Sequence, residues 1–212
     1  RGGGRARARR YGGCGRASQA YSMLRLGFIF APQQGGQMGV MKGQGALPRL
    51  QLMRDVRVMT ERDDILRAVL NPSFDAGRTV VLESPPMPLP DPAAAGGSAR
   101  IVDQSTDHMT IEADVPSPAV LLVTDVYSEG WRATALEGSS QQDYAVMPAN
   151  YILRAIPLTS GQHRLRLEYL PGAFVMGKWV SILGLLLYAG AWGAWFVQCR
   201  RRSAEPVAAA ST

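Results

Sequence analysis

The stretch HRLRLEYLPGAFVMGKWVSILGLLLYAGAWGAWFV, residues 163–197, places a strand pattern directly before a long apolar run. Apolar and polar side chains alternate over residues 163–170, which is typical of a half-buried strand. Residues 179–197 then hold no charged side chain in 19 positions. As a helix at about 1.5 Å per residue they span roughly 28 Å, close to a hydrocarbon core of about 30 Å. The sequence therefore predicts a transmembrane helix over residues 174–198.

The flanks of this apolar run predict its orientation. Aromatic side chains near both ends suit the two membrane interfaces, and positive side chains prefer the cytoplasmic face. One lysine precedes the run and three arginines follow it, so we expect residues 21–177 to be extracytoplasmic and residues 199–212 to form a cytoplasmic tail. The residues that carry this prediction are Lys178, Trp179, Trp192, Trp195, Arg200, Arg201 and Arg202.

Small residues recur at a spacing of four within the run, in the pairs Ala189 with Gly193 and Gly190 with Ala194. This spacing lets another helix approach closely, which would make other transmembrane helices partners of this one. Glycine and alanine are also common in membrane helices that have no such partner. The pattern leaves both alternatives open.

Upstream of the run, short strand patterns and turn residues dominate. Six strands are expected in residues 98–171, which indicates an antiparallel β-sandwich. Before them, residues 21–83 read as a small strand-helix-strand unit, with a capping signal at Thr60 and Asp63, and residues 84–97 read as a Pro-rich linker. The chain is thus predicted to be α+β, mainly β, with one C-terminal transmembrane helix. The six predicted strands are 101–104, 108–114, 119–127, 131–136, 151–156 and 163–170.

The formal charge of +6 is concentrated at the two ends of the chain. Residues 1–20 form a Gly/Arg tail that cannot bury a core and is expected to be disordered, although such a tail could also bind RNA or anionic lipid. The body is slightly acidic, which argues against a nucleic-acid partner. Cys14 and Cys199 lie far apart in the chain, and His108 and His163 have no neighbouring ligand at zinc spacing, so we expect no disulfide, metal or other cofactor.

No catalytic motif occurs in the sequence, and we assign no catalytic residue. The candidate ligand-binding residues are Trp131, Tyr127 and Asp125. Aromatic faces such as those of Trp131, Tyr127 and Tyr151 could stack against sugar rings, but core packing is the favoured role of Trp131. Asp125 could contact a glycan or Arg132, or form a carboxylate pair in space with Glu129.

Several ordered blocks resemble the carboxyl-terminal end of bacterial YfhO-like membrane proteins. They are ALPR (46–49), NPSFDAGRTVVLE (71–83), TDVYSEGWRATALEG (124–138) and NYILRAIPLTSGQHRLRLEYLPGAF (150–174), followed by the membrane helix. YSMLRLGFIFAP (21–32) is similar to the segment that leads into this region, so the resemblance covers about residues 21–200. Glu129 departs from the family, which usually has proline before Gly-Trp.

The resemblance implies a many-helix envelope protein that transfers sugar from a polyprenyl-phosphate carrier to a cell-envelope polymer. It also implies that the catalytic acid lies in an early extracytoplasmic loop that this chain does not contain. We therefore expect the chain to be a fragment: a membrane-proximal accessory domain and last helix in a bacterial plasma membrane, inactive alone. The alternative is a stand-alone, single-pass β module that binds an envelope glycan or protein without catalysis.

Overall fold

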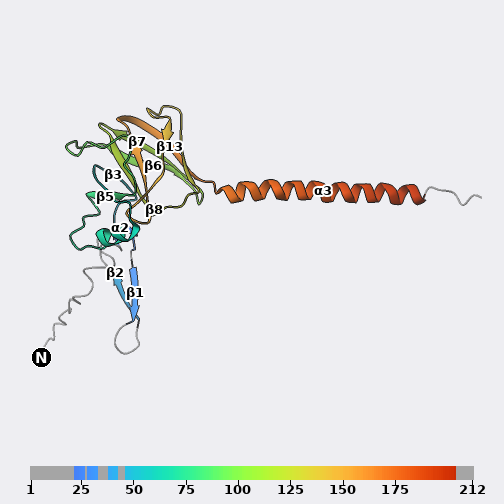
Figure 1. The fold of residues 1–212 in the computed structure, drawn as a ribbon, viewed down its shortest axis with the longest axis horizontal. Helices are drawn as coiled ribbons and strands as arrows, with labels where there is room; N and C mark the ends of the chain where they lie inside the picture. The colour runs from blue at the N-terminus through green and yellow to red at the C-terminus, as the bar shows by residue number, and fades with distance from the viewer. Residues whose placement is uncertain (1–21, 27, 33–37, 43–45, 204–212) are drawn as a thin grey trace, which may run out of the picture. The chain divides into compact units, whose positions relative to one another are not determined.

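The computed structural model describes residues 22–26, 28–32, 38–42 and 46–203. The predicted disorder of residues 1–20, and residues 204–212 of the predicted cytoplasmic tail, lie outside this part of the chain. The described residues form two compact units that divide between Tyr169 and Leu170. The first is built mainly from strands, with short helical segments, and the second holds a long helix, which confirms the predicted α+β, mainly β class (Figure 1).

Two sheets make up most of the first unit. The five-stranded sheet has the order β10-β9-β13-β7-β6 and is antiparallel throughout. Its alternating strands bury one face, as the burial of His163, Leu165 and Leu167 on β13 illustrates. The strands are β6 (Ser98–Gln104), β7 (His108–Val115), β9 (Trp131–Ala135), β10 (Asp143–Tyr144) and β13 (Gly161–Tyr169).

The six-stranded sheet has the order β3-β8-β12-β11-β5-β4. Its central strand β8 is buried at its first six residues, which agrees with the apolar sequence on both of its faces. One parallel pair, β4 with β5, makes this sheet mixed, and both of its strands lie in the predicted lead-in unit. The strand pairs within residues 98–171 are antiparallel, as the sequence predicts. The strands are β3 (Leu50–Met53), β4 (Asp55–Val58), β5 (Thr79–Leu82), β8 (Ala119–Val126), β11 (Met147–Ala149) and β12 (Leu153–Leu158).

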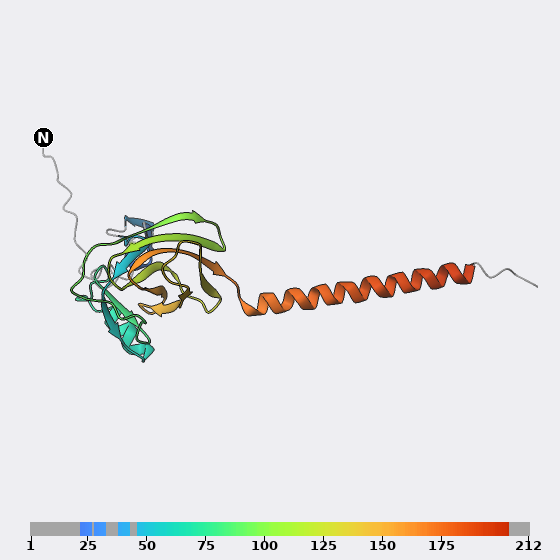
Figure 2. The same ribbon diagram turned by 90° about the horizontal axis from the view of Figure 1, so that it is seen from above.

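Two separate hydrophobic clusters explain why β8 is apolar on both faces. Leu121 and Val123 belong to the cluster shared with the five-stranded sheet. Val120 and Leu122 belong to the other cluster, which includes Ile65 of helix α2 (Arg62–Val69). The six-stranded sheet is therefore a middle layer between the other sheet and α2. In Figure 2, α2 (teal) lies on the opposite side of the body from β6 and β7 (green).

The structure differs from the predicted domain boundaries. The strands of the predicted lead-in unit, β3, β4 and β5, belong to the same sheet as β8, β11 and β12, so residues 50–82 and 98–169 fold as one unit. Residues 84–97 connect the two sheets and are held close to them. Arg54 donates a hydrogen bond to the Gly96 carbonyl, and a Cβ on Gly97, whose φ is 98°, would lie 2.8 Å from Leu52. The capping signal at Thr60 is also wrong, because Glu61 is the N-cap of α2.

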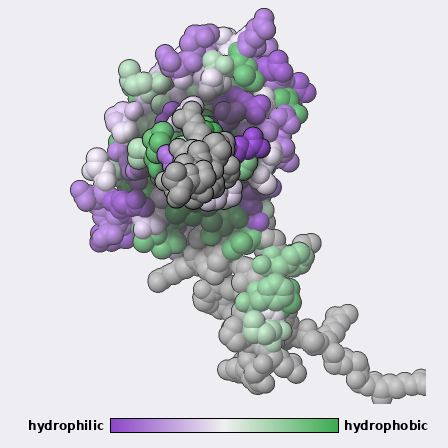
Figure 3. Space-filling view, turned by 90° about the vertical axis from the view of Figure 1, so that its right-hand side faces the viewer, coloured by the Kyte–Doolittle hydropathy of each residue, from purple (hydrophilic) through white to green (hydrophobic). Residues whose placement is uncertain are grey.

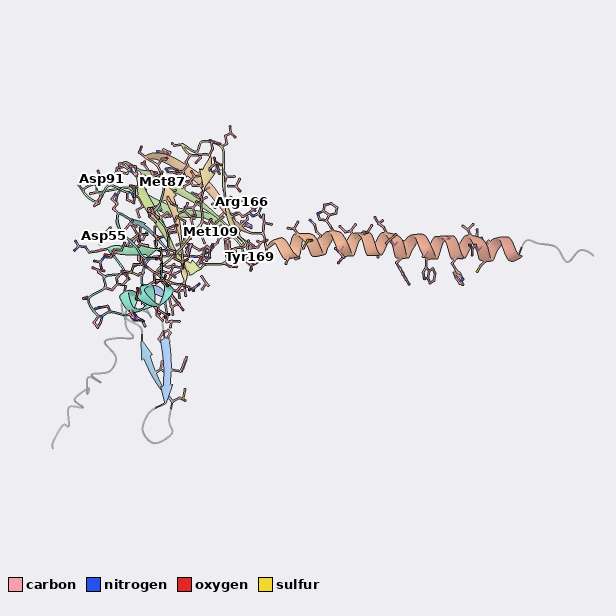
Figure 4. The ribbon with its side chains drawn as sticks, in the orientation of Figure 1. Asp55, Met87, Asp91, Met109, Arg166 and Tyr169 are labelled. Atoms are coloured by element: carbon pink, nitrogen blue, oxygen red, sulfur yellow. The ribbon has the colours of Figure 1, made fainter. Side chains whose placement is uncertain are left out.

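A third, two-stranded sheet pairs β1 (Phe28–Pro32) with β2 (Met38–Lys42), and the sequence does not predict these strands. The second unit is dominated by helix α3 (Gly172–Ser203). Its segment Gly172–Arg200 is long and apolar enough to cross a membrane. No other helix in the described residues has both the length and the hydropathy to do so. Side chains project from α3 on several sides (Figure 4).

Candidate functional site

One cleft of about 310 Å³ lies at an end of the six-stranded sheet. Strand register brings its walls together: Ala149 pairs with Leu82, and Leu153 pairs with Val126. The residues that follow β5 and β8 therefore lie beside the turn between β11 and β12, at the same end of the strands. We call this the Tyr127–Tyr151 cleft, and it is lined by Arg62, Glu83, Val126, Tyr127, Glu129, Pro148, Tyr151 and Ile152.

The turn that carries Tyr151 has an unusual backbone. Asn150 and Tyr151 have φ angles of 45° and 73°, in the left-handed region that costs a residue with a side chain about 1 to 2 kcal/mol. Backbone hydrogen bonds hold the turn in place: the Asn150 amide donates to the Val81 carbonyl, and the Tyr127 amide donates to the Ile152 carbonyl, both at 2.8 Å. The Asn150 side chain also accepts from the Val81 amide. The turn held in this way places Tyr151 in the lining of the cleft.

The polar groups of the cleft are an arginine, two carboxylates and two phenols. The Arg62 guanidinium lies 4.9 Å from the centre of the Tyr151 ring, which fixes one face of that ring by a cation–π contact. Burial raises the pKa of Tyr127, and the nearby carboxylates of Glu129 and Glu83 raise it further. Tyr127 is therefore a protonated phenol at neutral pH and can donate a hydrogen bond. Two carboxylates against one guanidinium leave the cleft with excess negative charge.

Asp125, a predicted ligand-binding residue, is occupied by an ion pair. Its carboxylate accepts hydrogen bonds from Arg49 Nε at 3.0 Å and Arg49 Nη2 at 2.8 Å, and Arg154 Nη2 lies 3.4 Å away. Burial lowers the pKa of Arg154 to about 10 against the opposing effect of Asp125, so Arg154 stays charged at neutral pH. Asp125 thus neutralises the charges of two arginines, Arg49 and Arg154. One of the alternatives from the sequence pairs it with Arg132, and the structure gives it these two partners instead.

Trp131 packs within the protein. It is half-buried against the cluster between the sheets, and the Arg154 guanidinium lies 3.9 Å from the centre of its ring. The Tyr169 ring, labelled in Figure 4, lies 5.3 Å from it by ring centroids. Arg154 and Tyr169 therefore both pack against the Trp131 ring. Among the described residues, Trp131 does not line the cleft, whereas Tyr127 does.

Sequence reasoning misses the two charged cleft residues Arg62 and Glu83. Arg62 begins α2 and Glu83 follows β5, far from Tyr127 in the chain. The signal that could have found Glu83 is its place at the end of a predicted strand beside other strand ends. The sequence leaves open a carboxylate pair of Asp125 with Glu129. In the structure Glu83 and Glu129 line the cleft, and Asp125 pairs with Arg49 and Arg154.

A second hollow of about 340 Å³ lies over β6, β7 and β13, with charged side chains along it. Glu112 accepts from Arg100 at 2.7 Å and lies 3.6 Å from Arg164. Arg100 and Arg164 are largely exposed, and such ion pairs contribute little. This hollow has the character of a solvated sheet face. In the part of the chain that the structure describes, no group of three or more His, Cys, Asp or Glu side chains could hold a metal ion.

The residues of the predicted membrane orientation lie along α3. Lys178 Nζ is 5.6 Å from the Trp179 ring, and the rings of Trp192 and Trp195 are 5.8 Å apart. Arg200 lies 4.8 Å from the Phe196 ring, while the side chains of Arg201 and Arg202 are outside the described set. The helix thus presents aromatic and cationic groups towards both of its ends.

His163 is buried in a hydrogen-bond chain behind the charged hollow. Its Nδ1 lies 2.8 Å from the Tyr144 hydroxyl, its Nε2 lies 3.0 Å from the Thr159 carbonyl, and the Tyr144 hydroxyl in turn contacts Ser139. The carbonyl can only accept, so Nε2 carries the proton and Nδ1 accepts from Tyr144. Burial lowers the pKa of His163, which keeps the ring neutral.

The depressed pKa of His163 predicts a loss of stability in acid. In the unfolded chain the His163 ring binds a proton near the ordinary pKa of 6.5, and in the folded chain it binds one only at lower pH. The contribution of His163 to the free energy of unfolding is therefore complete above pH 6.5 and decreases as the pH falls below 6.5. The loss should reach at most about 1.4 kcal/mol per pH unit. Urea unfolding between pH 7.5 and 5 measures it. His163→Gln should reduce the change of the free energy of unfolding with pH, and His108→Gln should not. An equal pH dependence in the wild type and both variants would contradict the role given to His163.

Comparisons of the chain with protein-family models, with curated proteins and with solved structures give no match.

Proposed function

We propose that this chain is a membrane-anchored β module that binds a neutral glycan in the Tyr127–Tyr151 cleft. Two tyrosines supply apolar faces with a polar hydroxyl, which suits the CH-rich faces of sugar rings. The carboxylates of Glu83 and Glu129 are acceptors for sugar hydroxyls. The single observation that carries the proposal is that aromatic and carboxylate side chains line the same cleft.

The size and charge of the cleft narrow the ligand. About 310 Å³ is at the lower end of the range for small-molecule sites, which is roughly 300 to 1,000 Å³, so the cleft accepts a short segment of a glycan. Its excess negative charge, from Glu83 and Glu129 against Arg62, repels acidic sugars. The ligand class is therefore a neutral oligosaccharide or a neutral segment of a longer polymer.

Helix α3 supports the membrane part of the proposal. Its apolar segment matches the thickness of a bilayer, and only Leu170 and Pro171 separate it from β13. A connection this short keeps the β module beside the membrane in which α3 is anchored. By the charge bias, residues 21–177 are extracytoplasmic in a bacterial plasma membrane, and the partners of α3 are lipid and other transmembrane helices.

Within this function, we assign the chain the role of accessory domain of a YfhO-like membrane glycosyltransferase. Its task is to hold an envelope polymer near a catalytic part that takes sugar from a polyprenyl-phosphate carrier. The stand-alone alternative is favoured by one observation, the complete two-layered core of the β module. An upstream reading frame that encodes many apolar helices supports the first role, and a start codon next to Arg1 supports the second.

Replacing Tyr127 by Ala is expected to weaken glycan binding about two- to tenfold, because an aromatic stacking contact contributes about 0.5 to 1.5 kcal/mol. Tyr127→Phe keeps the ring and should lose less. Calorimetric titration of the full chain in nanodiscs with neutral glucan and N-acetylglucosamine oligomers measures the affinities. Glu112→Gln in the other hollow is the control and should bind as the wild type. Equal affinity of the wild type and Tyr127→Ala would refute the cleft as the binding site.

A further inference from the structure

The hairpin β1–β2 carries an exposed apolar face. Its antiparallel register places Phe30 opposite Val40, and residues opposite each other in a sheet point to the same face. Alternation along the strands brings Phe28 and Met38 to that face as well. The exposed fractions are 62% for Phe28, 65% for Phe30, 63% for Met38 and 58% for Val40. In Figure 3 the hairpin is the green projection at the bottom of the molecule.

A two-stranded sheet of this kind needs a partner. An isolated hairpin is at best marginally stable in water. A row of exposed large apolar side chains marks a surface that a protein or a membrane covers. Because the two strands are paired, the apolar side chains of Phe28, Phe30, Met38 and Val40 lie on one face of the hairpin. The surface that covers them must accept phenylalanine, methionine and valine side chains together.

The charge of the surrounding chain points to lipid as that surface. Residues 1–54 contain no aspartate or glutamate, whereas Arg25 precedes the hairpin and Lys42 ends β2 at the position paired with Phe28. Apolar side chains bordered by cationic ones and without acids match a bilayer with anionic headgroups. The same chain carries α3, which can hold such a bilayer within reach of the module.

We infer that the β1–β2 hairpin inserts its apolar face into the interface of an anionic lipid bilayer, as a second membrane contact of the module. This inference rests on the anchoring of α3 that the proposed function contains.

Lipid quenching of a site-specific probe tests the insertion. Cys14 and Cys199 are changed to Ser in the full chain, and NBD is attached at Val40→Cys, at Leu186→Cys in α3, or at Gln142→Cys as an exposed control on the sandwich. The proteins are reconstituted at low density in vesicles of phosphatidylcholine with 30% phosphatidylglycerol, a composition chosen for roughly physiological anionic charge. Quenching by doxyl-labelled lipid is then compared.

The probe at Val40 should be blue-shifted and quenched well above the probe at Gln142, and Phe28→Ser with Phe30→Ser should return it to that control level. Quenching at Leu186 without quenching at Val40 above the control would overturn the inference while leaving the anchor intact. No quenching at Leu186 would instead remove the anchor that the proposed function requires. Pyrene excimers at Val40 without lipid quenching would show that a second copy covers the face, and would also overturn the inference.

Discussion

Replacing Asp125 by Ala is expected to lower the free energy of unfolding by about 2 to 3 kcal/mol. Asp125 is the carboxylate that compensates Arg154, of which only 3% is exposed, and it also binds Arg49. Removing one partner of a buried ion pair costs about 3 to 5 kcal/mol, because the remaining charge stays in the interior. Asp125 is itself partly exposed, with 22% of its side chain accessible, so we expect a smaller loss.

Asp64→Ala is the matched control for this prediction. Asp64 also pairs with an arginine at 2.8 Å, but 57% of its side chain and 76% of that of Arg67 are exposed. Such a pair contributes less than about 1 kcal/mol. Urea unfolding in nanodiscs can follow Trp131 emission, since the other three tryptophans lie in α3. Similar losses for the two variants would contradict the role of Asp125 as the internal counter-ion.

Replacing Leu82 by Ala is expected to cost about 3 kcal/mol in a single unfolding transition. Leu82 is fully buried on β5 and packs in one cluster with Val120 and Leu153 of the central strands. A Leu to Ala change in a core costs about 2 to 5 kcal/mol through lost transfer energy and the cavity that remains. Because β5 belongs to the six-stranded sheet, the whole β unit should lose stability together.

Leu89→Ala serves as the control, since 67% of Leu89 is exposed and the change should stay within about 0.5 kcal/mol. The same urea experiment distinguishes the observed sheet from the predicted separate lead-in unit. Two transitions, of which Leu82→Ala shifts one, would mean that residues 50–82 unfold independently and would contradict the single β unit.

Local pattern was sufficient for most of the sandwich. The alternation of residues 163–170 and 108–114 and the apolar run within residues 119–127 predict β13, β7 and β8, because burial on one face or on both leaves its period in the sequence. Strands β10 and β11, with two and three residues, are too short to show a period. The pairings of β3 with β8 and of β5 with β11 join residues 50–82 to the sandwich. They are long-range contacts, and no local signal in the sequence reveals them.

The cleft could be predicted only in part for the same reason. Tyr127 and Tyr151 were candidates because aromatic side chains beside strand ends are visible locally. Arg62 and Glu83 reach them through the register of the six-stranded sheet, which the sequence does not reveal. Asp125 looked equally available for a ligand until folding brought Arg49 and Arg154 to it.

The central claim is that the Tyr127–Tyr151 cleft binds a neutral glycan at a membrane surface. Its most direct test is a titration of the wild-type chain in nanodiscs with paired oligosaccharides of equal length, one neutral and one made of uronic acids. We predict saturable binding of the neutral oligomer, with the acidic oligomer at least tenfold weaker because Glu83 and Glu129 repel it. Binding of neither oligomer, or tighter binding of the acidic one, would contradict the claim.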